Sequence, residues 1–135
     1  MNEYEEIKET IDTYLMKLFK YRRSLVYLTT DNVISTRRNS RIDLYLRIRR
    51  KESTFPSECL IIARISFKKE RVGHGSHLVK FLAETALKYS FKHIGIESTN
   101  DKSGSFARKL GFQPIDGSNY AIAVNNLIDY FQVKD

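Results

Sequence analysis

Two glycines, Gly73 and Gly75, separate an apolar run that ends near Phe67 from a segment with helical periodicity. At the start of a helix several backbone N–H groups have no partner within the helix, and the helix dipole adds positive potential there. A glycine has no Cβ atom, so an anion can approach its backbone closely. We therefore predict a phosphate or pyrophosphate site at this turn, formed by Arg71, Val72, Gly73, His74, Gly75 and Ser76.

Other glycine turns compete for the same residues. A nucleoside triphosphate loop would place Lys and then Ser or Thr after the last glycine, whereas Gly75 is followed by Ser76 and His77. A dinucleotide-binding turn would place a third glycine where Leu78 stands, and only 38 residues follow Glu97, too few for the further strand-helix units of that fold. A turn with a purely structural role is a further alternative.

Two segments resemble the GNAT family of N-acetyltransferases. The family's acetyl-CoA motif is Arg or Gln, two residues, Gly, one residue, and Gly or Ala. Both glycines of the segment from Ile65 to Gly75 match it, whereas Glu70 stands at the Arg or Gln position. The family also shows Asn after its fifth strand and Gly-Phe eleven and twelve residues later, which Asn100 and Gly111-Phe112 reproduce. The resemblance covers Cys59 to about Pro114.

The resemblance implies acetyl-CoA as co-substrate and no metal. The pyrophosphate would lie on the N–H groups from Arg71 to Ser76, and the pantetheine arm would pair with the backbone from Ile65 to Phe67 like an added strand. Asn100 and Ser103 would line the same site, with Ser103 or Ser105 placed to hydrogen-bond the sulfur. His74 and His77 alone cannot form a metal site, because no third ligand is evident.

Acetyl transfer to an amine needs a base for the amine and an acid for the departing thiolate. The family often uses a tyrosine as the acid, but Ala107 stands at that position, so Tyr120 is the predicted acid. Glu97, at the end of a predicted strand beside the cofactor, is the predicted base. A structural ion pair is the alternative role for Glu97.

The elements that must position these residues follow from periodicity. Apolar residues lie on one face of a helix from Glu3 to Lys20, and Ile42 to Arg49 alternates apolar with polar residues as a half-buried strand does. The continuously apolar run from Cys59 to Phe67 predicts a central strand covered on both faces. The other predicted strands are Ser24–Thr30, Val33–Ser35, His93–Ser98 and Tyr120–Val124. The other predicted helices lie between Gly75 and Tyr89 and at Ser103–Leu110. The segment Leu127–Phe131 is predicted to be a turn or a strand.

This order predicts an α/β fold, a single-domain GNAT-like mixed sheet over residues 1–135. Antiparallel N-terminal strands are followed by strand-helix-strand-helix-strand. The family's usual first strand is shortened or absent. The only cysteine, Cys59, excludes a disulfide framework and reads as a small buried hydrophobe. No apolar run approaches the ~20 residues that cross a bilayer, and no leader pattern begins the chain, so we expect a cytoplasmic protein without a membrane partner.

Basic residues exceed acidic ones by 23 to 16, which gives a net charge of +7 that attracts polyanions. We predict an acetyl-CoA-dependent N-acetyltransferase that acts on a primary amine of a small molecule or protein, as a monomer or homodimer. Its acceptor pocket would be built largely by residues between Tyr14 and Phe55. Two alternatives remain: a catalytically impaired GNAT-fold binding or regulatory module, and a basic nucleic-acid-binding protein, although no zinc-finger or RNA-binding motif is present.

Overall fold

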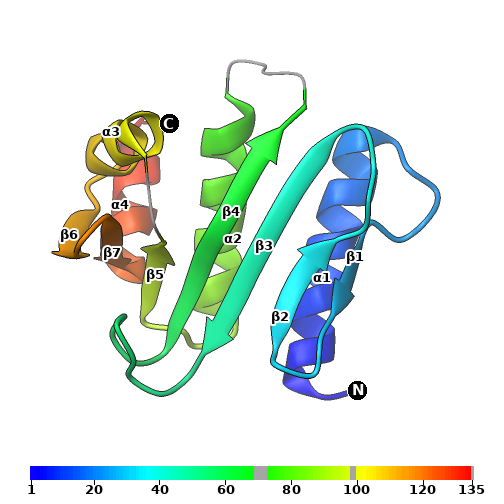
Figure 1. The fold of residues 1–135 in the computed structure, drawn as a ribbon, viewed down its shortest axis with the longest axis horizontal. Helices are drawn as coiled ribbons and strands as arrows, with labels where there is room; N and C mark the ends of the chain where they lie inside the picture. The colour runs from blue at the N-terminus through cyan, green and yellow to red at the C-terminus, as the bar shows by residue number, and fades with distance from the viewer. Residues whose placement is uncertain (69–72, 98–99, 135) are drawn as a thin grey trace.

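A computed structural model describes residues 1–68, 73–97 and 100–134. In these ranges seven strands form one mixed sheet in the order β1-β2-β3-β4-β5-β7-β6, and four helices accompany it (Figure 1). The predicted α/β class and mixed sheet are confirmed. The elements are α1 (Glu3–Phe19), β1 (Val26–Leu28), β2 (Val33–Thr36), β3 (Ile42–Arg49), β4 (Cys59–Phe67), α2 (His74–Lys88), β5 (His93–Ile96), α3 (Asp101–Lys109), β6 (Gln113–Asp116), β7 (Asn119–Ala123) and α4 (Val124–Lys134).

The first helix, α1, is fixed to the sheet by apolar packing and by one buried carboxylate. Ile7, Ile11 and Leu15 are fully buried, as the predicted amphipathic pattern requires. Asp12 is also buried, and its carboxylate accepts hydrogen bonds from the hydroxyl of Ser24 and the N–H groups of Leu25 and Val26 (2.5, 2.7 and 3.2 Å). A buried charge is tolerated when it is bonded in this way, so Asp12 ties the start of β1 to the helix.

The sheet has one apolar and one polar face over β3. Its even-numbered residues from Ile42 to Ile48 are buried in the main core with α1 and α2, which lie behind the sheet in Figure 1. The odd-numbered residues, Asp43, Tyr45, Arg47 and Arg49, point to the opposite face and are partly or fully exposed. This alternation is the one predicted from the sequence.

Strand β4 changes character along its length. It pairs with β3 in an antiparallel hairpin and with β5 in parallel, but the β5 pairing covers only Cys59 to Ile62. A bulge at Ala63 follows, because Leu46 pairs with Ile62 and Tyr45 with Arg64. The prediction of a strand buried on both faces is right for the first four residues and wrong for 63–67, which are half-buried or exposed.

The C-terminal region differs from the prediction. The predicted strand near Tyr120 is β7, and the additional strand β6 pairs with it across a turn at Gly117, whose φ is +53°. Residues from Val124 onward form the helix α4 rather than a turn or strand. Val124, Leu127 and Phe131 are buried at a helical spacing, and α4 packs beside α2.

A small second core lies on the other face of the sheet, where the β3–β4 connection folds over it. It consists of Phe55, Cys59, Ile61 and Ala121. Gly95 completes it, because a Cβ atom there would stand 2.6 Å from the Phe55 ring. Burial raises the pKa of the Cys59 thiol to about 12, so this thiol is a neutral core group, as predicted.

Candidate functional site

The glycine turn begins α2. Gly73 is the N-cap and has φ +93°, a left-handed conformation that favours glycine, and no side chain of the described residues caps this helix end. The first N–H groups of α2 therefore have no side-chain partner among the described residues. Gly75 and Ser76 lie in the first turn, whereas Arg71 and Val72, with Glu70, lie outside the described residues.

Gly75 faces the neighbouring helix α3. A Cβ atom at Gly75 would stand 3.7 Å from the tip of the Phe106 ring, an ordinary contact distance. Gly75 is helical and does not need a left-handed backbone, unlike Gly73. The absence of its side chain therefore leaves space between the start of α2 and the ring of Phe106.

Next to the turn, one edge of β4 is open. Beyond Ile62, which accepts a hydrogen bond from the N–H of Glu97 (2.9 Å), no described strand pairs with β4 on the β5 side. The N–H of Lys68 donates to the carbonyl of Arg41 beside β3 (2.8 Å). Because backbone groups alternate between the two sides of a strand, Ile65 and Phe67 direct their N–H and carbonyl groups into the gap. These are the two residues predicted to pair with the pantetheine arm.

His74 joins the turn to α1 and β4 through aromatic contacts. Its ring lies 6.0 Å from that of Phe19 and 5.4 Å from that of Phe67, measured between centroids. Its Nδ1 atom is buried and has no hydrogen-bond partner among the residues that the structure describes. His77 lies on the next turn, near Gly73, and within residues 1–68, 73–97 and 100–134 no three His, Cys, Asp or Glu side chains gather as metal ligands.

Asn100 and Ser103 form the N-terminal cap of α3. The Asn100 side chain accepts from the N–H of Ser103 (2.9 Å), and the N–H of Asn100 donates to the Ser103 hydroxyl (3.0 Å). This capping box gives both residues a structural role. Their contact with a cofactor stays a prediction.

Tyr120 is bound to an arginine that the sequence reasoning did not identify. Nη1 of Arg108 donates to the Tyr120 hydroxyl oxygen (2.6 Å), and Nη2 donates to Ser105 (3.2 Å). Tyr120 pairs with Ile96 at the carboxyl end of β5 and is nearly buried. Ala107, the residue before Arg108, is fully buried and offers no acid.

Glu97 follows β5 and lies on the polar face of the sheet, where it forms an ion pair with Arg47. Nε of Arg47 lies 2.9 Å from Oε2 of Glu97, and the hydrogen bond raises the pKa of the arginine. Ile96, the last residue of β5, points to the other face into the main core, as does Tyr120. The structure thus brings both predicted catalytic residues to one end of β5, on opposite faces.

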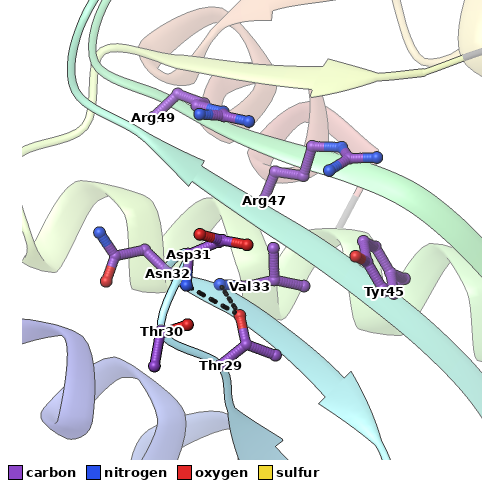
Figure 2. Close-up of a pocket in the computed structure, with 8 residues that line it drawn as sticks. All are labelled: Thr29, Thr30, Asp31, Asn32, Val33, Tyr45, Arg47 and Arg49. Carbon is purple, nitrogen blue, oxygen red and sulfur yellow. Dashed lines mark hydrogen bonds between the residues drawn. The ribbon is translucent and has the colours of Figure 1, made fainter.

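A hollow of about 500 Å³ lies on the polar face, at the β1–β2 turn (Figure 2). The hydroxyl of Thr29 accepts from the N–H groups of Asp31 and Val33 (both 3.2 Å) and shapes this turn. The sequence reasoning did not identify the hollow, since its residues come from separate strands and carry no motif. Its lining comprises Thr29, Thr30, Asp31, Asn32, Val33, Tyr45, Arg47 and Arg49.

No protein-family model matches the sequence, and no curated protein matches it. Solved structures do match. A variant of the toxin AtaT bound to the C-terminus of the antitoxin AtaR superimposes with a TM-score of 0.56 at 18% identity, over 76% of this chain and 71% of that chain. AtaTR bound with acetyl-CoA gives a TM-score of 0.55 at 16% identity, over 88% and 81%.

A third structure is an acetyltransferase of the GNAT family from Staphylococcus aureus Mu50, with a TM-score of 0.50 at 14% identity over 92% of this chain and 96% of that chain. The chain has the GNAT fold. Identities this low show the fold alone. Among the described residues, the start of α2, which no side chain caps, adjoins the edge of β4 that no strand covers, since the rings of His74 and Phe67 are in contact. No helix of the described residues is long and apolar enough to cross a membrane.

Proposed function

We propose that the protein is an acetyl-CoA-dependent N-acetyltransferase that acts on a primary amine. The observation that carries the proposal is the open edge of β4 next to the uncapped start of α2. An extended chain with amide groups fits the first, and a pyrophosphate fits the second. AtaTR, a structural neighbour, is described with acetyl-CoA bound, which supports the same ligand here.

The main chain provides most of the binding. The N–H groups of Gly73, His74, Gly75 and Ser76, with those of Arg71 and Val72, receive the pyrophosphate. Ile65 and Phe67 pair with the pantetheine amides, and the acetyl group reaches the bulge at Ala63. Asn100 and Ser103 fix the start of α3 on the other side of the thioester.

The reaction is a direct transfer. The amine nitrogen attacks the acetyl carbon, the N–C bond forms, and the C–S bond breaks to release coenzyme A as its thiolate. The Glu97 carboxylate takes the proton that the amine loses, and the Tyr120 hydroxyl gives its proton to the thiolate. The Tyr120 oxygen accepts from Arg108, so its own hydrogen is free to be donated, and the cation stabilises the resulting phenolate. Their positions on opposite faces suit an amine and a thiol that approach the gap from opposite sides.

A second candidate is a GNAT-fold module that binds acetyl-CoA without catalysis. Ala107 at the family's usual acid position favours it, as does the Arg47 partner of Glu97, because Arg47 occupies lone pairs of the carboxylate that could otherwise accept the proton of the amine. Both candidates require the cofactor site.

The first test is calorimetric titration of the purified protein with acetyl-CoA. We expect micromolar binding that is lost in Gly75→Glu, whose carboxylate would enter the space beside Phe106 and repel the pyrophosphate. Ile65→Pro removes an N–H that faces the gap, and Ile65→Ala is its control because it removes the side chain and keeps the N–H. Binding by the alanine variant and not by the proline variant supports backbone pairing.

Transfer is then measured with a panel of amines and a thiol-reactive reporter of released coenzyme A. Tyr120→Phe and Glu97→Gln each reduce kcat about 100-fold or more if these residues act as acid and base, with acetyl-CoA affinity unchanged. Binding without transfer would select the non-catalytic module. Absence of binding by folded, ligand-free protein would overturn the proposal.

A further inference from the structure

Seven exposed basic side chains gather at the end of the sheet that carries the glycine turn. They come from the α1–β1 connection, the β2–β3 turn and the end of β4, three segments that Figure 1 shows at the same end of the molecule. We name this surface the basic end. It comprises Lys20, Arg22, Arg23, Arg37, Arg38, Arg41 and Lys68.

Hydrogen bonds hold the three segments of the basic end together. The N–H of Arg37 donates to the carbonyl of Leu25 (2.7 Å), which links the β2–β3 turn to the start of β1. The hydroxyls of Tyr21 and Ser40 lie 3.3 Å apart, and the N–H of Lys68 donates to the carbonyl of Arg41. The seven cations are therefore presented by one connected surface, not by three independent loops.

The charge of the basic end is not balanced locally. None of the seven side chains forms an ion pair with a carboxylate of the described residues. The nearby acids are already bonded, since Asp12 is buried on backbone N–H groups and Asp43 pairs with Arg64 (2.7 Å). The seven cations of the basic end are as many as the excess of basic over acidic residues in the whole sequence, which is 23 against 16.

We propose that the basic end is a docking surface for the phosphate backbone of a nucleic acid. Five of the seven cations are arginines, whose planar guanidinium groups bind phosphate oxygens in a bidentate manner. A protein partner would require an apolar centre, yet these three segments contain none of the large exposed hydrophobic side chains of the described residues, and Tyr27 of β1 lies under Arg37. Nucleic-acid interfaces are polar and strongly basic, as this surface is.

This surface goes beyond the proposed acetyl transfer and does not depend on it. It adjoins Phe67 and His74, so a bound nucleic acid would lie beside the open edge of β4. Its test uses binding alone and needs neither acetyl-CoA nor an amine. Failure of this proposal therefore leaves the cofactor proposal standing, and the reverse also holds.

The test is fluorescence anisotropy with a labelled single-stranded RNA of about 20 nucleotides and, in parallel, a DNA duplex, titrated from 50 to 300 mM KCl. Two variants neutralise the surface, Arg22→Gln with Arg23→Gln, and Arg37→Gln with Arg38→Gln. The matched control, Lys51→Gln with Lys92→Gln, removes the same charge from exposed residues of the β3–β4 and α2–β5 connections, at the opposite end of the sheet.

We expect native protein to bind with an affinity that falls steeply with salt. Each surface variant weakens binding about tenfold and makes the logarithmic salt slope shallower by about 1 to 2, whereas the control changes affinity less than about twofold. No binding to either probe at 50 mM KCl overturns the proposal. Equal weakening of binding by the control variant also overturns the proposal. Equally tight binding of polyglutamate overturns it too, because that result would assign the surface to an acidic protein.

Discussion

The two halves of β4 differ from each other in burial and in the number of strands that they pair with. Cys59 to Ile62 is hydrogen-bonded on both sides and entirely buried. Residues 63–67 are paired with β3 alone, and their side chains alternate between half-buried and exposed. The first half stabilises the fold, and the second half leaves backbone groups available for a ligand.

The bulge at Ala63 separates the two halves. Leu60 and Ile62 face the helices before it, and Ile65 and Phe67 face the same side after it, so one extra residue shifts the alternation by one position. Because side-chain and backbone directions alternate together along a strand, the shift places the side chains of Ile65 and Phe67 on the core and also turns their backbone groups towards the gap. With the bulge at Ala63, β4 therefore packs apolar side chains on the core along both halves and directs backbone groups into the gap along its second half.

The largest expected effect is in the first half. Leu60→Ala removes a fully buried side chain and should lower the free energy of unfolding by about 2–5 kcal/mol. Ile65→Ala removes a half-buried side chain and should lower the free energy of unfolding clearly less than Leu60→Ala does. Urea unfolding followed by circular dichroism measures both, and equal losses would contradict the division of the strand.

The next largest effect is the dependence of the free energy of unfolding on pH, to which the Cys59 thiol contributes. Its pKa rises from 9.0 to about 12 in the folded protein, so the folded state holds this proton more tightly than the unfolded state. Stability from this group is complete below pH 9 and declines as pH rises towards 12, by up to about 1.4 kcal/mol per pH unit. The slope of the free energy of unfolding against pH is measured for the native protein and for Cys59→Ala. The difference between the two slopes is the contribution of the thiol. Rapid alkylation of the folded protein at pH 8 would contradict the burial.

Across the gap from the second half, the start of α3 depends on its capping box. Asn100→Ala should lower the free energy of unfolding by about 1 kcal/mol, whereas Asn100→Asp retains the cap and should cost much less. If Asn100 also contacts the cofactor, acetyl-CoA affinity falls in both variants. Thermal unfolding and calorimetry together separate the two roles.

The smallest stability effect is expected for the Arg47–Glu97 pair on the polar face. About a third of the Arg47 side chain and a quarter of the Glu97 side chain are exposed, so solvent screens the interaction. A double-mutant cycle with Arg47→Gln and Glu97→Gln should give a coupling energy below about 1 kcal/mol. A coupling of several kcal/mol would make this pair structural and argue against Glu97 as a base.

The sequence predicted the elements whose periodicity is strong, such as α1, β3 and α2. It missed β6, whose residues are all exposed and therefore carry no alternation. It assigned no helix to α4, because Val124, Tyr130 and Phe131 also suit a strand, and packing on α2 decides the outcome.

In the site, the glycine turn could be predicted from its motif, and the family resemblance implied that a ligand pairs with the backbone from Ile65 to Phe67. The bulge at Ala63 and the Arg108 partner of Tyr120 could not be predicted, since each depends on register or on side chains distant in the sequence. The clustering of the basic residues was equally hidden. They are spread from Lys20 to Lys68 in the sequence, and only the β2–β3 turn and the end of β4 bring them together.

The outer edges of the sheet also bear on where an extended ligand can add. Edge β1 has only three residues, and Asp12 binds the N–H of Val26 at its start. At the other edge, β6 contains Pro114, which has no N–H to offer. Both edges thus discourage pairing with a second chain. The backbone groups that a ligand could pair with therefore lie at an internal gap of the sheet and not at its outer edges.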